Sequence, residues 1–278
     1  MKKTLVATLV LSLVVVFAGG SKAETTTEAP ADTTVVEDEA TADEPVAEAP
    51  EEDAAADEET AEATGVMTYA DYVAADIDTE VCVETYVQAK QSWWEDNGVG
   101  QATFYTQNED GAFFIYNMPC SEEEYAQLVP GTKIKVTGFK SEWSGEVEIT
   151  DATFEIEEGD TFIATAKDVT DLLGKDELID SQNQFVSFKG MTVEAANDNG
   201  DAYLYKWDGS GTEGDDLYFN VSLDGNTYSF TVESYLCDKD SDVYKAVKEL
   251  KVGDVVDMEG FLYWYEGVNP HITSVTVQ

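Results

Sequence analysis

The string GTKIKVTGF in Gly131–Phe139 returns as GDVVDMEGF in Gly253–Phe261. A further glycine follows each string at the same offset of 122 residues, as Gly145 and Gly267. Each string alternates apolar and polar residues, which is typical of a half-buried strand. Self-similarity at a fixed spacing indicates an internal duplication, so the sequence predicts two related units.

The residues around these strings predict the same order of elements in both units. Asp110-Gly111 and Asp224-Gly225 each stand between two alternating runs, as in a β-hairpin turn. Ser121–Glu124 forms a capping box that opens a short helix, and Pro130-Gly131 ends it. The expected strands are 80–90, 101–107, 112–118, 133–139 and 146–154 in the first unit, and 185–195, 217–223, 227–233, 254–262 and 272–277 in the second, with a helix over 241–250.

Five strands with a helix between the third and fourth is the order of an OB-fold barrel. The predicted fold class is therefore mainly β, with two tandem OB-fold-like five-stranded barrels. Thr68–Asp71 and Thr165–Asp168 match each other ahead of the barrels. Each predicts the start of a short capped helix.

The string VPGTKIKVTG in Val129–Gly138 resembles the exported tandem OB-fold proteins and lipoproteins of Gram-positive, gut-type bacteria. The resemblance covers residues 66–278. It implies the barrel fold, and it implies neither a ligand nor any catalytic residue.

The first 23 residues predict a secretory signal peptide. Met1-Lys2-Lys3 is basic, Leu5–Phe17 is apolar, and small residues allow cleavage before Glu24. The predicted location is therefore extracellular or at the cell surface. The same segment is similar to a lipobox, but Gly20 stands where lipid attachment needs cysteine, which argues against lipid anchoring by this route.

Residues 24–64 hold 16 acidic residues and no lysine, arginine or aromatic residue. Such a composition offers too little apolar surface to offset the entropy of ordering. We predict a disordered acidic linker, either a spacer from the envelope or a solubilising tail. The barrels are then expected at 65–159 (domain 1) and 160–278 (domain 2).

Residues 65–278 carry 42 acidic residues against 12 lysines, a net charge of −30, and the sequence has no arginine. A surface this negative repels nucleic acid, anionic lipid and acidic glycans. Arginine is also the residue that most often forms bidentate hydrogen bonds with phosphate and guanine. Charge therefore favours a neutral or cationic partner.

The sequence holds little catalytic material. His271 is the only histidine and has no nucleophile beside it, which favours a structural role. Three cysteines, Cys82, Cys120 and Cys237, show no metal-type spacing, and unpaired thiols are the default, with a Cys82–Cys120 bridge as the alternative. We predict no enzyme activity and no cofactor.

An acidic run resembles a calcium loop. Asp238, Asp240, Asp242 and Glu249 match EF-hand positions, but Val243 replaces the required glycine. Carboxylates are also expected at the start of a helix, so we favour helix capping over a metal site.

Aromatic residues gather in the loops that OB-folds use for binding, between strands 1 and 2 and between strands 4 and 5. They offer stacking faces for a ligand, or they cover the barrel ends and join the barrels. Trp93 and Trp94, in a polar loop, are the expected main contacts. The candidate ligand-binding residues are Trp93, Trp94, Trp143, Tyr203, Tyr205, Trp207, Tyr263, Trp264 and Tyr265.

The leading hypothesis is a non-enzymatic, secreted or cell-surface binding protein whose aromatic loops take a neutral glycan or a protein partner. The alternative is an OB-fold that binds single-stranded nucleic acid through the same rings. A metal-assisted hydrolase using the acidic clusters ranks third.

Overall fold

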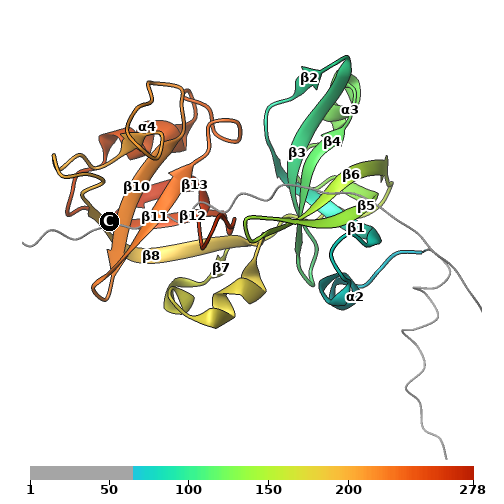
Figure 1. Ribbon diagram of the computed structural model, residues 1–278, viewed down its shortest axis with the longest axis horizontal. Helices are drawn as coiled ribbons and strands as arrows, with labels where there is room; N and C mark the ends of the chain where they lie inside the picture. The colour runs from blue at the N-terminus through green and yellow to red at the C-terminus, as the bar shows by residue number, and fades with distance from the viewer. Residues whose placement is uncertain (1–64) are drawn as a thin grey trace, which may run out of the picture. The chain divides into compact units, whose positions relative to one another are not determined.

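The computed structural model describes residues 65–278, which Figure 1 colours from blue to red along the chain. The predicted signal peptide (1–23) and acidic linker (24–64) lie outside these residues. The described residues all belong to one compact unit, which holds two β-barrels.

The first barrel closes in the strand order β1-β5-β6-β4-β3, with β3 pairing back onto β1. Strands β4 and β6 are parallel, and the other neighbours are antiparallel. Its strands are β1 (Glu80–Lys90), β3 (Val99–Gln107), β4 (Ala112–Pro119), β5 (Lys133–Trp143) and β6 (Glu146–Ile156), joined by helices α2 (Tyr69–Ala74) and α3 (Glu122–Gln127) and the edge strand β2 (Trp94–Asp96).

The second barrel repeats this connectivity as β8-β12-β13-β11-β10, with β10 pairing back onto β8. Its strands are β8 (Phe185–Glu194), β10 (Leu217–Leu223), β11 (Asn226–Val232), β12 (Val255–Phe261) and β13 (His271–Val277), with helix α4 (Asp242–Glu249). The short elements β7 (Lys167–Asp168), η1 (Thr170–Leu172), η2 (Asp176–Ser181) and β9 (Leu204–Tyr205) complete it.

Both rings are five-stranded barrels with a helix between their third and fourth strands (Figure 1), which is the OB-fold arrangement. The predicted fold class, two tandem OB-fold-like barrels, is confirmed. The capping box is also present, because the Glu124 carboxylate accepts the Ser121 N–H at 2.7 Å and Ser121 Oγ accepts the Glu124 N–H at 3.2 Å.

Each barrel encloses its own apolar core. The alternation in β1 places Val81, Val83 and Val87 inside the first barrel. Helix α4 places Tyr244 and Val247 in the core of the second barrel. Burial of aliphatic and aromatic side chains on this scale is the main stabilising contribution for small barrels.

The duplicated glycines occupy equivalent places in the two barrels. Gly138 in β5 and Gly260 in β12 each lie at an irregularity in the pairing with the next strand. A Cβ atom on Gly138 would lie 2.8 Å from the Thr150 carbonyl oxygen, and one on Gly260 would lie 2.2 Å from the His271 carbonyl oxygen. Both glycines are therefore required by the close approach of the following strand.

The second capped helix is a wrong prediction. Lys167–Asp168 forms strand β7, parallel to the start of β8. The Asp168 carboxylate accepts the Thr170 N–H at 3.1 Å and so begins the 3₁₀ turn η1 instead. Pairing with β8 holds this backbone extended, which overrides the local capping pattern.

The two barrels share a third apolar cluster. Tyr105 and Phe114 of the first barrel pack against Phe261 of the second. Polar contacts cross the same boundary, since the Gln107 side-chain oxygen accepts the Phe185 N–H at 2.8 Å. The barrels are therefore joined by a packed contact as well as by the chain.

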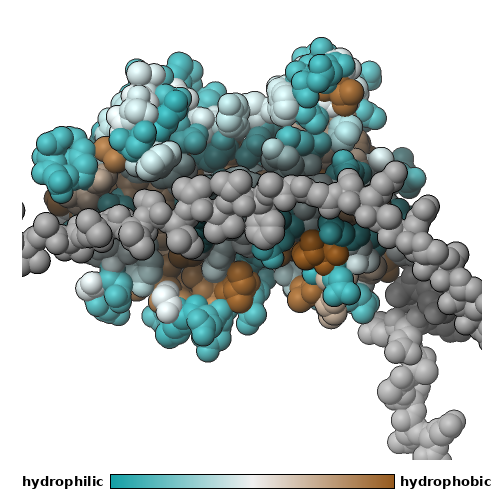
Figure 2. Space-filling model, in the orientation of Figure 1, coloured by the Kyte–Doolittle hydropathy of each residue, from teal (hydrophilic) through white to brown (hydrophobic). Residues whose placement is uncertain are grey.

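Most of the surface in Figure 2 is hydrophilic, with small separate hydrophobic patches among the described residues. No helix within residues 65–278 has the length and apolar character needed to cross a membrane.

Candidate ligand cleft between the two barrels

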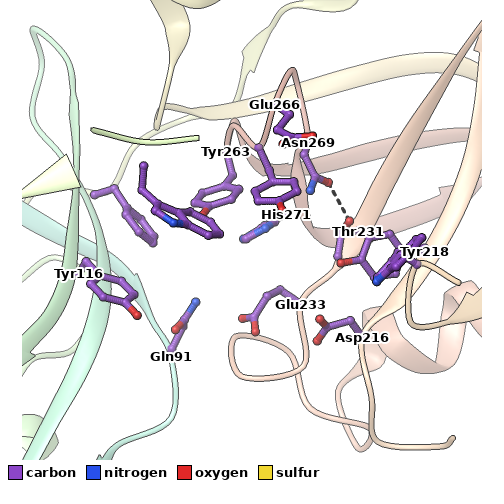
Figure 3. Close-up of a pocket in the computed structure, with 14 residues that line it drawn as sticks. Gln91, Tyr116, Asp216, Tyr218, Thr231, Glu233, Tyr263, Glu266, Asn269 and His271 are labelled. Atoms are coloured by element: carbon purple, nitrogen blue, oxygen red, sulfur yellow. Dashed lines mark hydrogen bonds between the residues drawn. The ribbon is translucent and has the colours of Figure 1, made fainter. Parts of the chain in front are cut away.

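A cleft of about 700 Å³ lies between the two barrels, and Figure 3 shows its side chains. Strand β4 and the segment after β1 line it from the first barrel. Strands β10, β11 and β13 and the β12–β13 loop line it from the second. A pocket of this size with mixed aromatic and polar walls is typical of small-ligand sites.

The equivalent fourth-to-fifth-strand connections of the two barrels meet at the cleft. The rings of Trp143 and Tyr265 lie 5.1 Å apart at 40°. The Glu266 N–H donates to the Ser144 carbonyl oxygen at 2.7 Å, which fixes the two connections together. Trp143 is 53% exposed, so this ring pair presents an open face to a ligand.

A buried histidine supports a second platform. The Tyr263 ring stacks on His271, with centroids 4.2 Å apart at 23°. His271 Nδ1 lies 2.6 Å from the Tyr105 hydroxyl, and no residue in 65–278 hydrogen-bonds to Nε2. Burial lowers the pKa of His271 to about 3, so the imidazole is neutral at physiological pH.

Three acidic residues of the second barrel line the cleft, and two of them, Glu233 and Asp216, accept backbone hydrogen bonds. Glu233, 9% exposed, accepts the Tyr235 N–H at 3.1 Å and the Leu236 N–H at 2.8 Å. Asp216 Oδ1 accepts the Ser234 N–H at 2.8 Å. Burial raises the pKa of Glu233 to about 7, and the nearby Asp216 charge adds to the rise against the backbone hydrogen bonds.

A smaller pocket of about 490 Å³ adjoins the cleft and shares Gln91 and Tyr116 with it. Ser92, Trp94, Asn117 and Tyr235 complete its walls. The Ser92 N–H donates to the Tyr235 carbonyl oxygen at 2.8 Å across the barrel boundary. Together the two pockets form an extended aromatic surface.

The structure brings five of the nine candidate residues to this surface. Trp143, Trp207, Tyr263 and Tyr265 line the cleft, and Trp94 lines the adjoining pocket. Trp207 is the most open of them, at 76% exposed.

The other four lie elsewhere. Trp93 packs on the first core and donates from Nε1 to the Cys120 carbonyl oxygen at 3.0 Å, so it is tied into the barrel. Trp264 packs on the second core. Tyr203 and Tyr205 make an edge-to-face pair in a separate pocket of the second barrel.

Sequence reasoning missed the strand-borne part of the surface. Phe114 and Tyr116 alternate on β4, and Tyr218 lies on β10. The signal in the sequence was an aromatic residue at position 116 of the expected strand 112–118, and the structure leaves Tyr116 46% exposed. His271 was assigned a structural role, which its Tyr105 contact supports, yet it also lines the cleft.

Within residues 65–278 no cluster of three or more histidine, cysteine or acidic side chains could hold a metal ion. Asp242 instead lies in the first turn of α4, and Ser241 caps that helix. The three cysteines of this region are unpaired. Burial raises the pKa of Cys120 to about 11, which opposes thiolate chemistry.

No protein-family model and no curated protein matches the sequence. Solved structures that resemble it include a murine DNA-binding protein bound to double-stranded DNA (11% identity, 71% of this chain, 94% of that chain, TM-score 0.32). Others are the p204 HINb domain (12%, 73%, 100%, TM-score 0.33) and a replication protein A heterotrimer bound to single-stranded DNA (12%, 72%, 48%, TM-score 0.29). At such TM-scores these likenesses do not bear on the ligand.

Proposed function

We propose that this protein binds a glycan without negative charge in the cleft between its barrels, and that it does so without catalysis. The observation that carries the proposal is the meeting of stacking faces from both barrels, Trp143 with Tyr265 and Tyr263 with His271, around polar side chains. Sugar rings have an apolar face suited to such platforms and hydroxyls suited to amides and carboxylates.

The polar groups of the cleft suit hydroxyl recognition. Gln91 offers an amide from the first barrel, and Asp216 and Glu233 offer acceptors from the second (Figure 3). Asn269 accepts the Thr231 hydroxyl at 2.8 Å, which leaves its amide donors available. Groups held in place in this way lose little entropy when a ligand binds.

The same charges disfavour the nucleic-acid alternative. The cleft wall includes Asp216, Glu233 and Glu266 and no lysine. Nucleic acids bind where cationic side chains neutralise the phosphates and release the counterions of the nucleic acid. The cleft wall supplies no cationic side chain.

The hydrogen bonds of Glu233 favour binding over catalysis. Its raised pKa beside Asp216 would suit a glycosidase acid. However, both oxygens of Glu233 already accept backbone N–H groups, which fixes the side chain as an acceptor. We therefore assign this pair to binding.

The test is a glycan array probed with the whole protein, followed by titration of the best ligand and chromatography of that ligand after incubation. Trp143→Ala is expected to weaken binding more than about tenfold, as loss of a central aromatic contact does. Phe139→Ala, an exposed aromatic on the same strand β5 outside the cleft, is the matched control. Failure to bind any glycan, equal binding by Trp143→Ala, or a cleaved ligand would overturn the proposal.

A further inference from the structure

The walls of the cleft carry acidic side chains that form no ion pair with any lysine of residues 65–278. Asp216, Glu233 and Glu266 line it, and no lysine does. The six ion pairs among residues 65–278 all involve other acidic residues. A partly buried carboxylate without a counter-charge raises the free energy of the unliganded protein. A cationic group bound in the cleft would lower that free energy.

Two of these carboxylates are already positioned to receive such a group. In Figure 3 the Glu233 and Asp216 carboxylates lie side by side, with the Gln91 amide facing them across the cleft. Backbone N–H groups of Tyr235 and Leu236 hold Glu233. Ser234 binds only Oδ1 of Asp216, and no residue in 65–278 hydrogen-bonds to Oδ2.

The remaining walls also accept a cation. Trp207, Trp143 and Tyr265 supply aromatic faces that attract an ammonium group. His271 lines the same cleft, is almost fully buried, and has Nε2 free of any partner in the described chain. Because this imidazole is neutral, it adds a hydrogen-bonding group without repelling a positive charge.

We propose that the glycan bound in the cleft is an amino-sugar oligosaccharide whose protonated amine lies between Glu233 and Asp216. This inference rests on the proposed function and narrows it to one ligand class. A charge-assisted hydrogen bond from an ammonium group is shorter and stronger than one from a hydroxyl, so the amine decides selectivity. The aromatic platforms also stack on the sugar rings, which contributes affinity for charged and uncharged oligosaccharides alike.

Three oligosaccharides of equal length and the same β-1,4 linkage distinguish binding of a glycan from selection of its amine. Glucosamine oligomers carry an ammonium group at carbon 2, N-acetylglucosamine oligomers an amide, and glucose oligomers a hydroxyl. We expect calorimetry with the whole protein to show the glucosamine oligomer binding at least about tenfold tighter than the other two, or about 1.4 kcal/mol. Salt should reduce this preference, because the contact is ionic.

Asp216→Asn is the informative variant, because asparagine keeps the oxygen that accepts from Ser234 while removing the charge. It should reduce the preference to within about threefold, because it weakens binding of the glucosamine oligomer more than binding of the glucose oligomer. Glu233→Gln should act similarly, and Glu142→Gln, an exposed glutamate outside the cleft, should change nothing. Equal affinity for all three oligomers, or a preference that survives Asp216→Asn, would overturn the amine assignment while the glycan site stands. Binding of none of them and of no other glycan would overturn both.

Discussion

The Glu146 carboxylate of the first barrel accepts a hydrogen bond from the Trp264 backbone N–H of the second at 2.8 Å. Gln182 Nε2 donates to the same oxygen at 3.2 Å. The other oxygen, Oε1, has no partner, and neither has the nearby Asn183 Oδ1. Burial raises the pKa of Glu146 to about 8, so at neutral pH it is mostly protonated and can act as a donor at this barrel contact.

Glu146 is expected to stabilise the fold through its Oε2 atom, which accepts hydrogen bonds from Trp264 and Gln182. Glu146→Ala leaves the Trp264 N–H without its acceptor at about 1–3 kcal/mol, and it removes one of the two acceptors of Gln182 Nε2, which keeps the Gly145 carbonyl oxygen. The melting temperature should therefore fall by at least about 5 °C. Glu146→Gln keeps an acceptor and should stay within about 2 °C of the wild type at pH 8. Thermal melts check this, with the exposed Glu142→Ala on the same hairpin as control. Equal melting of the alanine and glutamine variants would contradict the assignment.

Stability should fall as pH rises from 6.5 to 8.5. Burial raises the pKa values of Glu146 to about 8 and of Glu148 and Glu233 to about 7, above the value near 4.3 of an unfolded chain. Between the unfolded and folded pKa values the folded state binds more protons than the unfolded state. The stability that these three carboxyl groups contribute is therefore fully present below pH 4.3 and is lost as pH rises through the folded pKa values. Burial lowers the pKa of His271, so the ionisation of His271 changes stability only below pH 6.5. Melts should show the decline, and Glu146→Gln should flatten it; a rising melting temperature would refute this account.

Trp143 and Trp264, from the fourth-to-fifth-strand connections of the two barrels, should differ in their contributions to the free energy of unfolding. Trp264 packs on the second core, and Trp264→Ala should cost about 3 kcal/mol of unfolding free energy. Trp143 is mostly exposed, and Trp143→Ala should change that free energy by no more than about 0.5 kcal/mol. Denaturant unfolding monitored by circular dichroism distinguishes them. A loss of several kcal/mol for Trp143→Ala would assign that ring to the fold.

Single-stranded DNA should not bind. The described residues carry a net charge of −30 and the cleft no lysine, so phosphate contacts lack their electrostatic term. Fluorescence anisotropy with a mixed-sequence oligonucleotide at about 0.15 M salt should show no saturation. Tight binding that is lost in Trp143→Ala would replace the glycan proposal.

Gly260→Ala should destabilise the second barrel. Its new Cβ atom would lie 2.2 Å from the His271 carbonyl oxygen, so β12 and β13 must separate. We expect a cost of about 2–4 kcal/mol, as other overpacked or strained sites show. Glu259→Ala, the exposed neighbour, is the control for urea titration. A cost no greater than the control's would show that the strands yield at this point.

The barrel strands were predictable because their information is local. Alternation in 80–90 predicts β1 to the residue. The Asp224-Gly225 turn predicts the β10–β11 hairpin, with β11 one residue earlier than the expected 227–233. The prediction at Thr165 failed because strand pairing with β8 is a non-local contact that a capping pattern does not encode.

The candidate site was only partly predictable for the same reason. Loop rings such as Trp143 and Trp207 could be chosen from their place between strands. Glu233 and Asp216 could not, because their roles depend on how two separate barrels face each other. Trp93 shows the converse, since a polar neighbourhood in sequence gave no sign of its hydrogen bond to Cys120.

The contact between the barrels has two parts. Strands β3 and β4 of the first copy pack against β12 and β13 of the second, which are different places of the repeat. Trp143 and Tyr265, in contrast, occupy the same position of the repeat and contact each other. Phe139 and Phe261 are the same position of the repeat, yet Phe261 is 3% exposed and Phe139 is 43% exposed. The same position of the repeat is thus an interior residue in the second copy and a solvent-facing residue in the first, so the two phenylalanines are subject to different packing constraints.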